Sequence, residues 1–485
     1  MSTPPEWVNP EPAAPYNVVV IGAGTAGLVA SAGAAILGAR VALVERNLMG
    51  GDCLNFGCVP SKALIACSRA AHVVRSAADC GITVKDASID FSACMQRLRR
   101  LRAEISHHDS AERFRSLGAD VFIGEARFVA TDAVEVDGRK LKFSKAIIAA
   151  GARATEPPIP GLRETGYLTN ETVWSLTTLP ARLIVIGGGP VGCELAQAFR
   201  RLGSDVTVMT NGSQLLPRED PDAAALLESR FRAEGIQIIP HARIGNAEHT
   251  ATGKMVLFER DGTLDRVTGD AILVAVGRSP NVEGLGLETA GVEHHVNGIK
   301  VDDRLRTTNP RVYAAGDICS KYKFTHAAEA MARIALQNAL FFGRKKASDL
   351  VIPWCTYTDP EIAHVGLYES QARQHRFAVE TFTAKLQEND RAIVDGETEG
   401  FGRVHMDRKS GKILGATLVG AHAGETIGEF VLAIQRGLKL SDLGGVIHPY
   451  PTQAEITKRL GDSSMKSRLK PWMKRLLTRF FEMRR

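Results

Sequence analysis

The chain has 485 residues, of which 44% are hydrophobic and 24% are charged. This balance is typical of a folded protein and excludes a disordered or fibrous chain, and the length predicts about three domains. The formal net charge is +6, but ten Lys or Arg and only two acidic residues fall within 458–485, so the rest of the chain carries a slight negative surplus. The body of the protein therefore has no basic excess that would favour nucleic acid as a partner.

No run of about 18 residues is uniformly apolar, so no transmembrane helix is expected. Residues 1–15 are rich in proline and lack the basic start and apolar core of a secretory signal, so we expect a disordered leader. Eight cysteines are too few for a disulfide scaffold. The sequence therefore favours a cytoplasmic protein with reduced thiols, in which any close Cys pair is a redox or metal candidate.

The first chemical motif is glycine-rich and follows a buried strand. The apolar run 17–21 leads into Gly22, Gly24 and Gly27 of a G-x-G-x-x-G pattern, and the next strand ends at Glu45. The three glycines permit a tight turn, approach of the backbone to a pyrophosphate and close packing of helix on strand, and the carboxylate can bind ribose hydroxyls. This unit predicts a bound dinucleotide.

The same pattern recurs about 165 residues later. The run 182–186 leads into Gly187, Gly189 and Gly192, and the following strand ends at Thr210. A second dinucleotide is implied, most simply a diffusible nicotinamide beside a bound flavin. Since no acid stands at the second strand end, repulsion of a 2′-phosphate is absent, which favours NADPH, and NADH remains the alternative.

A close cysteine pair lies in the segment GGDCLNFGCVPSK, residues 50–62. Cys53 and Cys58 are five residues apart with a glycine between them, a spacing that allows a disulfide across one turn. If a helix begins near Val59, its dipole and Lys62 lower the pKa of the Cys58 thiol. Redox activity, a structural disulfide and two buried thiols are the alternatives, whereas a metal site would want more ligands nearby.

This segment resembles the active-site signature of the flavin disulfide reductases, a family that includes glutathione reductase, dihydrolipoamide dehydrogenase and mercuric reductase. The resemblance extends over about residues 16–461 and implies FAD and NADPH or NADH as cofactors. Besides the residues of the two glycine-rich units, it implies FAD contacts at Gly51, Lys62, Ala126, Gly151, Gly316 and Asp317, and a nicotinamide contact at Gly277.

The resemblance also implies catalytic roles. Cys58 would be the charge-transfer thiolate beside the isoalloxazine, and Cys53 the interchange thiol that meets the substrate. Lys62 and Glu194 resemble the ion pair near flavin N5. Electrons would pass from NAD(P)H through the flavin to the cysteine pair and on to an oxidised small molecule, either a metal ion or a disulfide.

One departure from the disulfide reductases lies near the C-terminus. These enzymes use a His-Pro, followed five residues after the His by a Glu, as acid and base. Here Glu455 stands at the matching place, but Tyr450 replaces the base, as in mercuric reductase, and a phenol is a poor base at neutral pH. This favours a mercuric reductase-like enzyme, although no cysteine follows Cys355 to deliver the metal. In the alternative, His448 is the base of a dihydrolipoamide dehydrogenase or another disulfide reductase.

The expected fold class is α/β, with two Rossmann-like dinucleotide-binding domains and a C-terminal α+β domain. We expect an FAD-binding domain at 16–155 and 281–345, an NAD(P)-binding domain at 156–280, and a dimerisation domain at 346–460. A homodimer is implied because the family's active site takes C-terminal residues from the partner subunit.

The tail, 461–485, is basic and amphipathic. Its apolar residues share one helical face, and Lys474, Arg475 and Arg479 lie off it. Such a helix either lies on an anionic membrane, which would suit a membrane-surface electron-transfer flavoprotein, or packs against the dimer body with a solvated basic face. The remaining six cysteines are scattered and are expected to be core thiols, and no metal site is expected.

Overall fold

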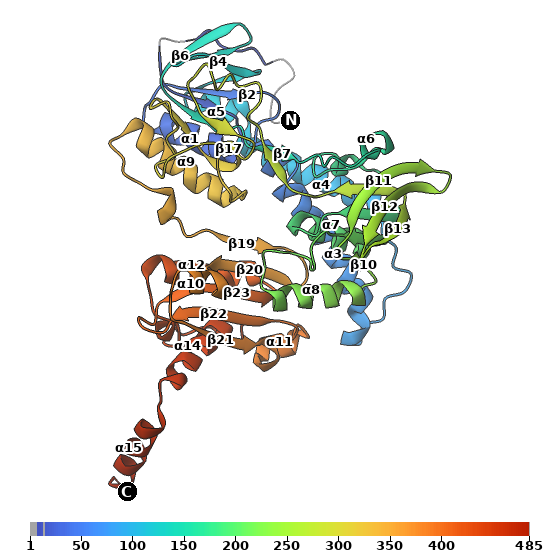
Figure 1. The fold of residues 1–485 in the computed structure, drawn as a ribbon, viewed down its shortest axis with the longest axis vertical. Coiled ribbons are helices and arrows are strands. Elements are labelled where there is room, and N and C mark those ends of the chain that lie inside the picture. The colour runs from blue at the N-terminus through green and yellow to red at the C-terminus, as the bar shows by residue number, and fades with distance from the viewer. Residues whose placement is uncertain (1–6, 13–14, 485) are drawn as a thin grey trace. The chain divides into compact units, whose positions relative to one another are not determined.

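The computed structural model describes residues 7–12 and 15–484 and divides into two compact units (Figure 1). The first unit comprises Met1–Ser213 and Glu234–Leu350, and the second comprises Gln214–Ala233 and Val351–Arg485. Each unit has its own sheets and its own core.

The main sheet of the first unit has the order β3-β2-β1-β6-β5-β4, and β18 pairs with β6. Every residue of β2 is buried, as expected of a parallel strand with both faces covered. The parallel strands are β1 (Tyr16–Ile21), β2 (Val41–Glu45), β3 (Ala119–Ile123), β6 (Arg139–Ile148) and β18 (Val312–Ala314). Two antiparallel pairings extend the sheet beyond β6: β5 (Ala133–Val136) pairs with β6, and β4 (Ala126–Ala130) pairs with β5.

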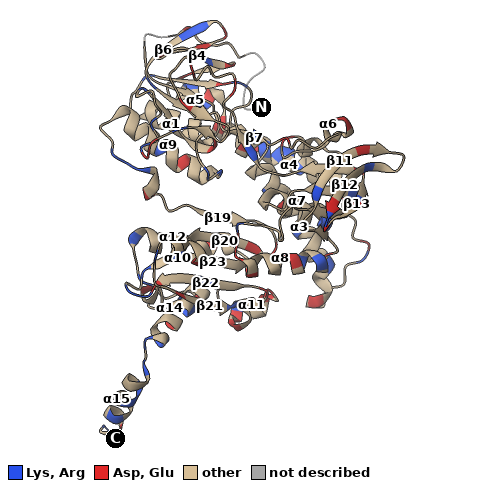
Figure 2. Ribbon diagram, in the orientation of Figure 1, with Lys and Arg blue, Asp and Glu red and all other residues tan. Residues whose placement is uncertain are grey.

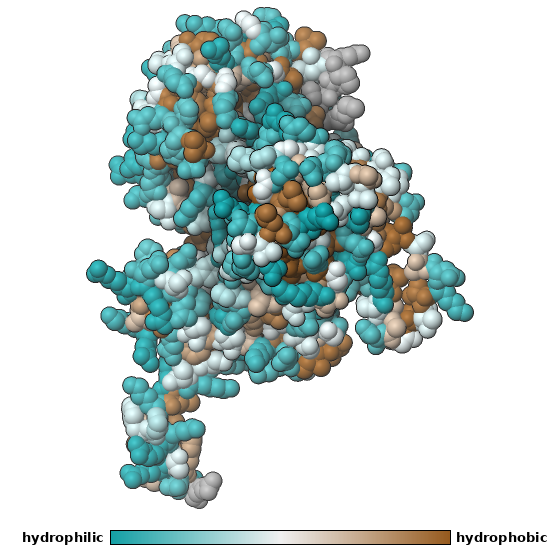
Figure 3. All heavy atoms as spheres, turned by 45° about the vertical axis from the view of Figure 1, so that its right-hand side comes forward, coloured by the Kyte–Doolittle hydropathy of each residue, from teal (hydrophilic) through white to brown (hydrophobic). Residues whose placement is uncertain are grey.

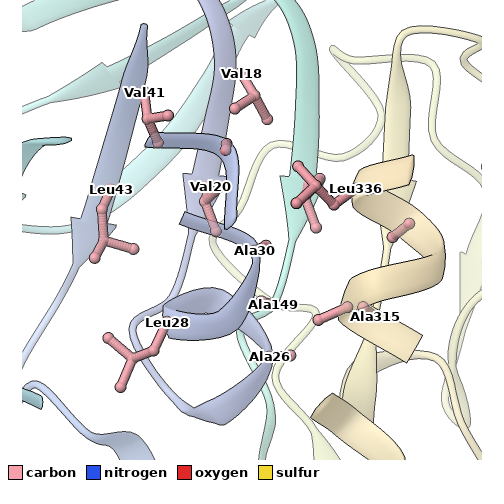
Figure 4. Packing of buried hydrophobic residues seen from close by; sticks show 14 of the residues in the cluster. Val18, Val20, Ala26, Leu28, Ala30, Val41, Leu43, Ala149, Ala315 and Leu336 are labelled. Carbon is pink, nitrogen blue, oxygen red and sulfur yellow. The ribbon is translucent and has the colours of Figure 1, made fainter. Parts of the chain in front are cut away.

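Helices α1 (Thr25–Ile36) and α9 (Thr325–Leu340) pack together over one face of this sheet, as Figure 4 shows. They approach closely because small residues face the contact: a Cβ at Gly33 would lie 2.7 Å from Leu336 Cδ2. The same face of α1 buries three alanines four residues apart, Ala26, Ala30 and Ala34. This packing fixes the start of each helix beside the carboxyl end of the sheet.

Four further helices lie near the first sheet, and two of them begin at a side-chain cap. Asp90 and Ser110 accept hydrogen bonds from backbone N–H groups at the starts of α4 and α5, which satisfies otherwise unpaired donors there. These helices are α2 (Gly51–Asn55), α3 (Cys58–Ser76), α4 (Phe91–Ser106) and α5 (Ala111–Ser116).

A second parallel sheet in the first unit has the order β10-β9-β8-β14, with α7 (Pro190–Leu202) after β8. Its strands are β8 (Arg182–Ile186), β9 (Asp205–Met209), β10 (Gln237–Ile239) and β14 (Ala271–Val274). An antiparallel sheet follows, with β11 (Arg243–Thr250), β12 (Gly253–Arg260) and β13 (Thr263–Gly269). Smaller elements are α6 (Leu162–Thr165), β7 (Ala152–Ala154), β15 (Arg278–Pro280), β16 (His294–His295) and β17 (Gly298–Ile299).

The second unit is built on an antiparallel sheet in the order β19-β20-β23-β22-β21. Its strands are β19 (Pro353–Thr356), β20 (Glu361–Gly366), β21 (Val379–Lys385), β22 (Phe401–Asp407) and β23 (Ile413–Gly420). Its helices are α8 (Pro221–Ala233), α10 (Glu369–Gln374), α11 (Asp390–Asp395), α12 (Ala423–Arg436), α13 (Leu440–Leu443), α14 (Glu455–Ser467) and α15 (Pro471–Glu482).

Helix α8 groups with the second unit although it lies within the segment 156–280 that the sequence assigns to nicotinamide binding. The buried Glu219 carboxylate just before it accepts hydrogen bonds from Trp354 Nε1 (2.7 Å) and Tyr368 OH (2.6 Å). Arg403 forms an ion pair with Asp220 at 2.7 Å. These contacts join two parts of the chain that are far apart in sequence.

The expected α/β class is confirmed, with two parallel sheets of the Rossmann type and an α+β unit.

Part of the expected disordered leader is ordered. Trp7 Nε1 donates to Val121 O at 3.3 Å, and the Asn9 side chain exchanges two hydrogen bonds with Ile123 of β3. These contacts cover the edge strand β3 and hold residues 7–9 in place in spite of the proline content of the leader. Residues 1–6 and 13–14 lie outside the described part. Within 7–12 and 15–484, no helix is long and apolar enough to span a membrane.

Candidate active site

The first glycine-rich loop has the geometry that its motif predicts. Gly22 has φ +102°, and a side chain there would collide with Ala149 O. A Cβ at Gly27 would collide with Gly22 O, which is what close packing of α1 on β1 requires. Gly24 starts α1 with no side-chain cap, and a Cβ on Gly51 would collide with it. The result is a side-chain-free cradle at a helix N-terminus, which fits a dinucleotide pyrophosphate.

Glu45 ends β2 directly beside this loop. Its side chain is buried, and its two oxygens accept hydrogen bonds from the backbone N–H groups of Ala23 (2.7 Å) and Asn47 (2.9 Å). Burial raises the pKa of Glu45, and the two N–H donors oppose that effect. The carboxylate thus holds the loop in place and keeps further lone pairs for a ribose hydroxyl, which is the role predicted for it.

The other predicted FAD-contacting residues lie around the carboxyl end of the same sheet. Ala126 is the buried first residue of β4. Gly151 has φ +65° and accepts a hydrogen bond from Asn281 N. Gly316 has φ +81°, a left-handed conformation that favours glycine, and a Cβ there would lie 3.2 Å from Ala328 Cβ of α9 and 3.4 Å from Ala26 Cβ of α1. Three chain segments therefore converge on one edge, where the motif residues were predicted to meet.

Asp317 follows Gly316, and its neighbour Arg278 was missed by the sequence reasoning. Burial raises the pKa of Asp317, and the charge of Arg278, whose Nε lies 3.5 Å from Asp317 Oδ2, lowers it. Arg278 Nη2 also lies 3.1 Å from Asp52 Oδ1, next to Cys53. One guanidinium thus links two carboxylates on either side of the predicted flavin site. The preceding residue, Gly277, was singled out from the family resemblance, but Arg278 was not.

The second glycine-rich loop repeats the arrangement of the first. Gly187 has φ +119°, and side chains at Gly187 or Gly192 would collide with backbone. A Cβ at Gly189 would meet no atom within 4 Å, so the space before the start of α7 is open to a ligand. Thr210 follows β9, is 6% exposed and accepts a hydrogen bond from Gly212 N at 3.3 Å. The second loop therefore has a threonine at the strand end, where the first loop has the carboxylate of Glu45.

Gly277 completes the predicted nicotinamide set. Its φ is +128°, and its carbonyl accepts a hydrogen bond from Thr155 N at 3.0 Å. This hydrogen bond joins the two segments of the chain that run between the two parallel sheets of the first unit.

Cys53 and Cys58 are neighbouring thiols at the start of α3. Cys53 lies in α2, and Cys58 is the first residue of α3, one residue earlier than the sequence predicted. A hydrogen bond from Cys53 lowers the pKa of Cys58 to about 6, with further lowering from Thr325 and from the charge of Lys62, against an opposing effect of burial. The same pairing raises the pKa of Cys53. Both shifts favour a thiolate at Cys58 and a protonated thiol at Cys53.

Thr325 is the second residue that sequence reasoning missed. It is the first residue of α9, and its Oγ1 lies 3.4 Å from Cys58 Sγ. Two helix N-termini thus meet at one sulfur, and both favour its anionic form. A contact across 267 residues has no local sequence signal.

Lys62 and Glu194 form the ion pair that was predicted from the family. Lys62 Nζ lies 2.7 Å from Glu194 Oε2, and the glutamate side chain is only 7% exposed. The pair connects α3 to α7, so the thiol segment and the second glycine-rich loop share one electrostatic contact.

The three C-terminal candidates differ sharply in exposure. His448 is half-buried with its side chain 8% exposed, and its Nε2 lies 3.1 Å from Glu429 Oε2 and 3.0 Å from Thr457 Oγ1. Tyr450 is 71% exposed, and its hydroxyl donates to Asp390 Oδ2 at 2.9 Å, which raises the pKa of Tyr450. Glu455 is the first residue of α14. All three belong to the second unit, whereas the two cysteines and their ion pair belong to the first.

The remaining six cysteines were expected to be core thiols, but the structure buries only one of them. Cys193 is buried, but Cys80 is exposed. The other four are half-buried, namely Cys67, Cys94, Cys319 and Cys355. The expectation fails most clearly for Cys80, whereas the half-buried Cys319 and Cys355 pack against the margins of hydrophobic cores.

Comparisons with known proteins agree with this geometry. Residues 16–332 match the model of the pyridine nucleotide-disulphide oxidoreductase family, and residues 352–460 match its dimerisation domain. The chain is 35% identical to a mercuric reductase of Bacillus cereus over 91% of the chain and 70% of that protein. It is 33% identical to a dihydrolipoyl dehydrogenase of Bacillus subtilis over 93% of the chain and 97% of that protein.

Among solved structures, the chain is similar to the HOCl-induced flavoprotein disulfide reductase RclA from Escherichia coli. The TM-score is 0.82 at 29% identity, and the alignment covers 92% of this chain and 99% of that one. A Cu(II) complex of the same reductase matches with a TM-score of 0.83 at 28% identity, covering 93% of this chain and 100% of that one.

Proposed function

Because the chain belongs to the pyridine nucleotide-disulphide oxidoreductase family, whose enzymes use FAD and NAD(P)H, we propose that it reduces a metal ion of the Hg(II) type at Cys53 and Cys58. FAD, when bound, supplies the electron pair that it takes from the nicotinamide. The glycine cradle at Gly24 and Gly51 would hold its pyrophosphate. The open space at Gly189 would receive the nicotinamide dinucleotide, with NADPH preferred because Thr210 replaces an acid.

The chain's own residues would prepare the thiols for a soft cation. Cys58, with a pKa of about 6, is largely anionic at neutral pH and can bind the metal directly. Cys53 gives up its proton when it becomes the second sulfur ligand. Lys62 offsets the negative charge that collects at the pair. A bound Hg(II) then takes up two electrons and leaves as the element.

The observation that favours a metal over a disulfide is the placement of Tyr450. Reduction of a disulfide needs a proton for the leaving thiolate, and the family's histidine base is replaced by an exposed phenol whose pKa is raised further by Asp390. The His448 side chain is only 8% exposed and its Nε2 is already hydrogen-bonded to Glu429 and Thr457, which argues against the disulfide reductase alternative. Reduction of a metal ion needs no such proton. The Cu(II) complex of the related reductase adds Cu(II) as a second cation to test.

The experiment is a set of anaerobic turnover assays that follow NADPH oxidation by the flavoprotein. Hg(II), Cu(II), lipoamide and oxidised glutathione are offered separately, with Cys58→Ser as the inactive control. We expect turnover with Hg(II) or Cu(II) and none above background with the disulfides. Tyr450→His is the matched gain-of-function variant, and it should introduce disulfide turnover. Disulfide turnover by the unaltered protein that His448→Gln abolishes would refute the proposal and identify a disulfide reductase.

We also propose that the protein is a homodimer, because residues 352–460 match the family's dimerisation domain. The exposed Tyr450 would then face the partner subunit's cysteine pair. Light scattering of the flavin-loaded protein at micromolar concentration should give twice the chain mass, and a monomer mass would contradict the proposal.

A second candidate function concerns α15 and an anionic membrane. The structure describes all residues of α15, and none of them is buried. Figure 2 shows Lys and Arg along this helix, and Figure 3 shows apolar side chains among them. The exposed apolar residues are Trp472, Leu476, Leu477, Phe480, Phe481 and Met483. Basic charge beside an apolar face suits phosphatidylserine-type lipids, and surface attachment would place the enzyme near membrane electron acceptors.

Liposome co-sedimentation of the full chain tests the membrane proposal. We expect binding to vesicles with anionic lipid and much weaker binding to neutral vesicles. The triple variant with Trp472, Phe480 and Phe481 replaced by Ser keeps the charges and should lose binding. Equal sedimentation of the variant and the unaltered chain, or a change in subunit assembly without any lipid binding, would instead support a helix that packs on the dimer body.

A further inference from the structure

The backbone between the two cysteines is held by side chains from distant parts of the first unit. Residues 54–57, which we call the linker, join Cys53 in α2 to Cys58 at the start of α3. The last carbonyls of a helix have no donor within that helix and must find one elsewhere. At the end of α2, the carbonyls of Asn55 and Phe56 both accept hydrogen bonds from side chains outside the linker.

Trp174 supplies one of these donors. Its indole Nε1 donates to Phe56 O at 2.9 Å, a contact between residues 118 positions apart. The Trp174 side chain is 3% exposed, so water competes little for this hydrogen bond. Arg99 of α4 holds the main chain beside the indole, because its Nη2 donates to Trp174 O at 3.1 Å and to Leu176 O at 2.8 Å. The donor is therefore fixed through both its side chain and its backbone.

Arg102 supplies the other donor. It lies three residues after Arg99, on the same face of α4, and its Nη1 donates to Asn55 O at 3.2 Å. The buried Asn55 side chain points back along the chain, and its Nδ2 donates to Gly51 O at 2.8 Å and to Met49 O at 3.0 Å. The end of α2 is thus tied to α4 on one side and to its own first turn on the other.

Asp52 blocks movement of the linker in another direction. Phe56 N donates to Asp52 O at 2.8 Å. A Cβ at Gly57 would lie 2.9 Å from Asp52 Oδ2 and 3.1 Å from Asp52 O, so the backbone already approaches Asp52 closely. Arg278 holds this carboxylate, with Nη2 3.1 Å from Asp52 Oδ1. The linker therefore lies between Asp52 and the two donors with little freedom to shift.

A fixed linker matters because the redox change of the pair is a change of geometry. The structure contains Cys53 and Cys58 as free thiols. Oxidation forms one sulfur–sulfur bond and removes two protons and two electrons, and it brings the sulfurs from van der Waals contact to bonding distance. The hydrogen bonds from Trp174 and Arg102 are formed in the dithiol state, so a linker that contracts on oxidation must strain or lose them.

We propose that Trp174 and Arg102 are positioning residues that shift the equilibrium of the cysteine pair towards the dithiol. Neither side chain contacts a sulfur in this role, and each acts through a carbonyl of the linker. A stabilised dithiol makes the disulfide a stronger oxidant of the flavin, which favours delivery of electrons to the pair. This inference rests on the proposed function only in taking Cys53 and Cys58 as the redox pair.

The experiment measures the dithiol–disulfide equilibrium of the flavin-loaded protein in anaerobic glutathione buffers of graded ratio. Each pair that closes gives its two electrons and two protons to oxidised glutathione, which becomes two thiols. Acid quenching, alkylation with N-ethylmaleimide and mass spectrometry of the peptide that contains Cys53 and Cys58 give the fraction of each form. Trp174→Phe removes the indole N–H and no charge. We expect it to shift the equilibrium about fivefold towards the disulfide, the factor expected for one hydrogen bond of ordinary strength. For a two-electron couple, this lowers the potential by about 20 mV.

The second donor is tested independently of the first. Arg102→Met should shift the equilibrium in the same direction as Trp174→Phe, and it tests the proposal even where the tryptophan variant folds poorly. Arg102→Lys keeps the charge and a donor for Asn55 O, so its shift should be smaller. This comparison separates loss of the hydrogen bond from loss of the positive charge.

Trp354→Phe is the matched control, because it removes an indole hydrogen bond in the second unit, from Nε1 to Glu219 Oε1 at 2.7 Å. Its melting temperature should fall while the equilibrium of the cysteine pair stays unchanged. Lower melting temperatures with an unchanged equilibrium in both Trp174→Phe and Arg102→Met would overturn the proposal and leave these side chains a purely structural role. A shift towards the dithiol would refute its direction. Since no Hg(II) is present, these results do not depend on whether the protein reduces a metal ion.

Discussion

The hydroxyl of Thr325 offers a direct test of how the Cys58 thiolate is stabilised. Thr325 Oγ1 lies 3.4 Å from Cys58 Sγ, and this contact helps lower the pKa of Cys58 to about 6. Thr325→Val keeps the shape of the side chain and removes the hydrogen bond. A hydrogen bond to a charged group contributes ~1.5–3 kcal/mol in a protected site. Because Cys58 is exposed to water, which competes, we take about 1.4 kcal/mol, which is about one pKa unit.

The expected result is an apparent pKa of about 7 in place of about 6 for the thiol pair. At pH 7 the thiolate fraction then falls from roughly nine-tenths to roughly one-half. The assay is the rate of iodoacetamide alkylation of the reduced protein between pH 5 and 9. Mass spectrometry of the peptide that contains Cys58 separates this thiol from the other cysteines, and the fitted pKa belongs to the coupled pair.

Thr325→Ser is the matched control, since it keeps the hydroxyl and loses only a methyl group. Its titration should stay close to that of the unaltered protein. If the valine and serine variants titrate alike, the hydroxyl does not stabilise the thiolate, and the lowered pKa must come from Cys53 and Lys62 alone. A shift of the valine variant to lower pH would refute the sign of the argument.

Three further predictions follow from the same structure. Gly189→Ala should raise the KM for NADPH at unchanged thermal stability, because its Cβ enters open space where the dinucleotide would bind. Gly192→Ala should instead lower the melting temperature, because its Cβ clashes with the backbone. Enzyme kinetics and calorimetry separate the two effects. Lys62→Met should raise the pKa of Cys58 by less than loss of the threonine hydroxyl does, as the same alkylation assay would show. Burial lowers the pKa of His364 from 6.5 to about 3. The second unit should therefore lose stability as the pH falls from 6.5 towards 3, by up to ~1.4 kcal/mol per pH unit. In urea unfolding, the stability of His364→Gln should depend less steeply on pH than that of the unaltered protein.

Local patterns in the sequence predicted the parts of the site that lie within one stretch of chain. Gly22 and Gly27 could be assigned from spacing because each must avoid a backbone clash inside a single strand–turn–helix unit. The start of helix α3 was also predicted to within one residue, because its signal lies in one short stretch of chain. The ion pair of Lys62 and Glu194 joins different segments and was available only through resemblance to a family.

Contacts between distant segments without a family signature could not be predicted. Thr325 reaches Cys58 because α9 packs along α1, which depends on the shapes of both helices. The exposure of the six other cysteines likewise depends on how helices and strands pack, and their scattered positions in the sequence gave only the expectation of core thiols. Packing of whole elements decides such contacts, and no spacing rule encodes it.

Helix α3 shows how position on a helix decides the chemistry of a thiol, because Cys58 and Cys67 lie at different places along it. Cys58 occupies the first position of the helix, where unpaired N–H groups, a donor from Cys53 and the charge of Lys62 all favour the anion. Cys67 lies in the middle of the same helix, where the backbone N–H groups are already bonded within the helix and are not available to a sulfur anion. A thiolate near neutral pH is a nucleophile that can exchange electrons with a substrate, so the first turn of a helix is the favourable place for a redox thiol. The start of α3, rather than the number of its cysteines, therefore decides where the proposed redox step takes place.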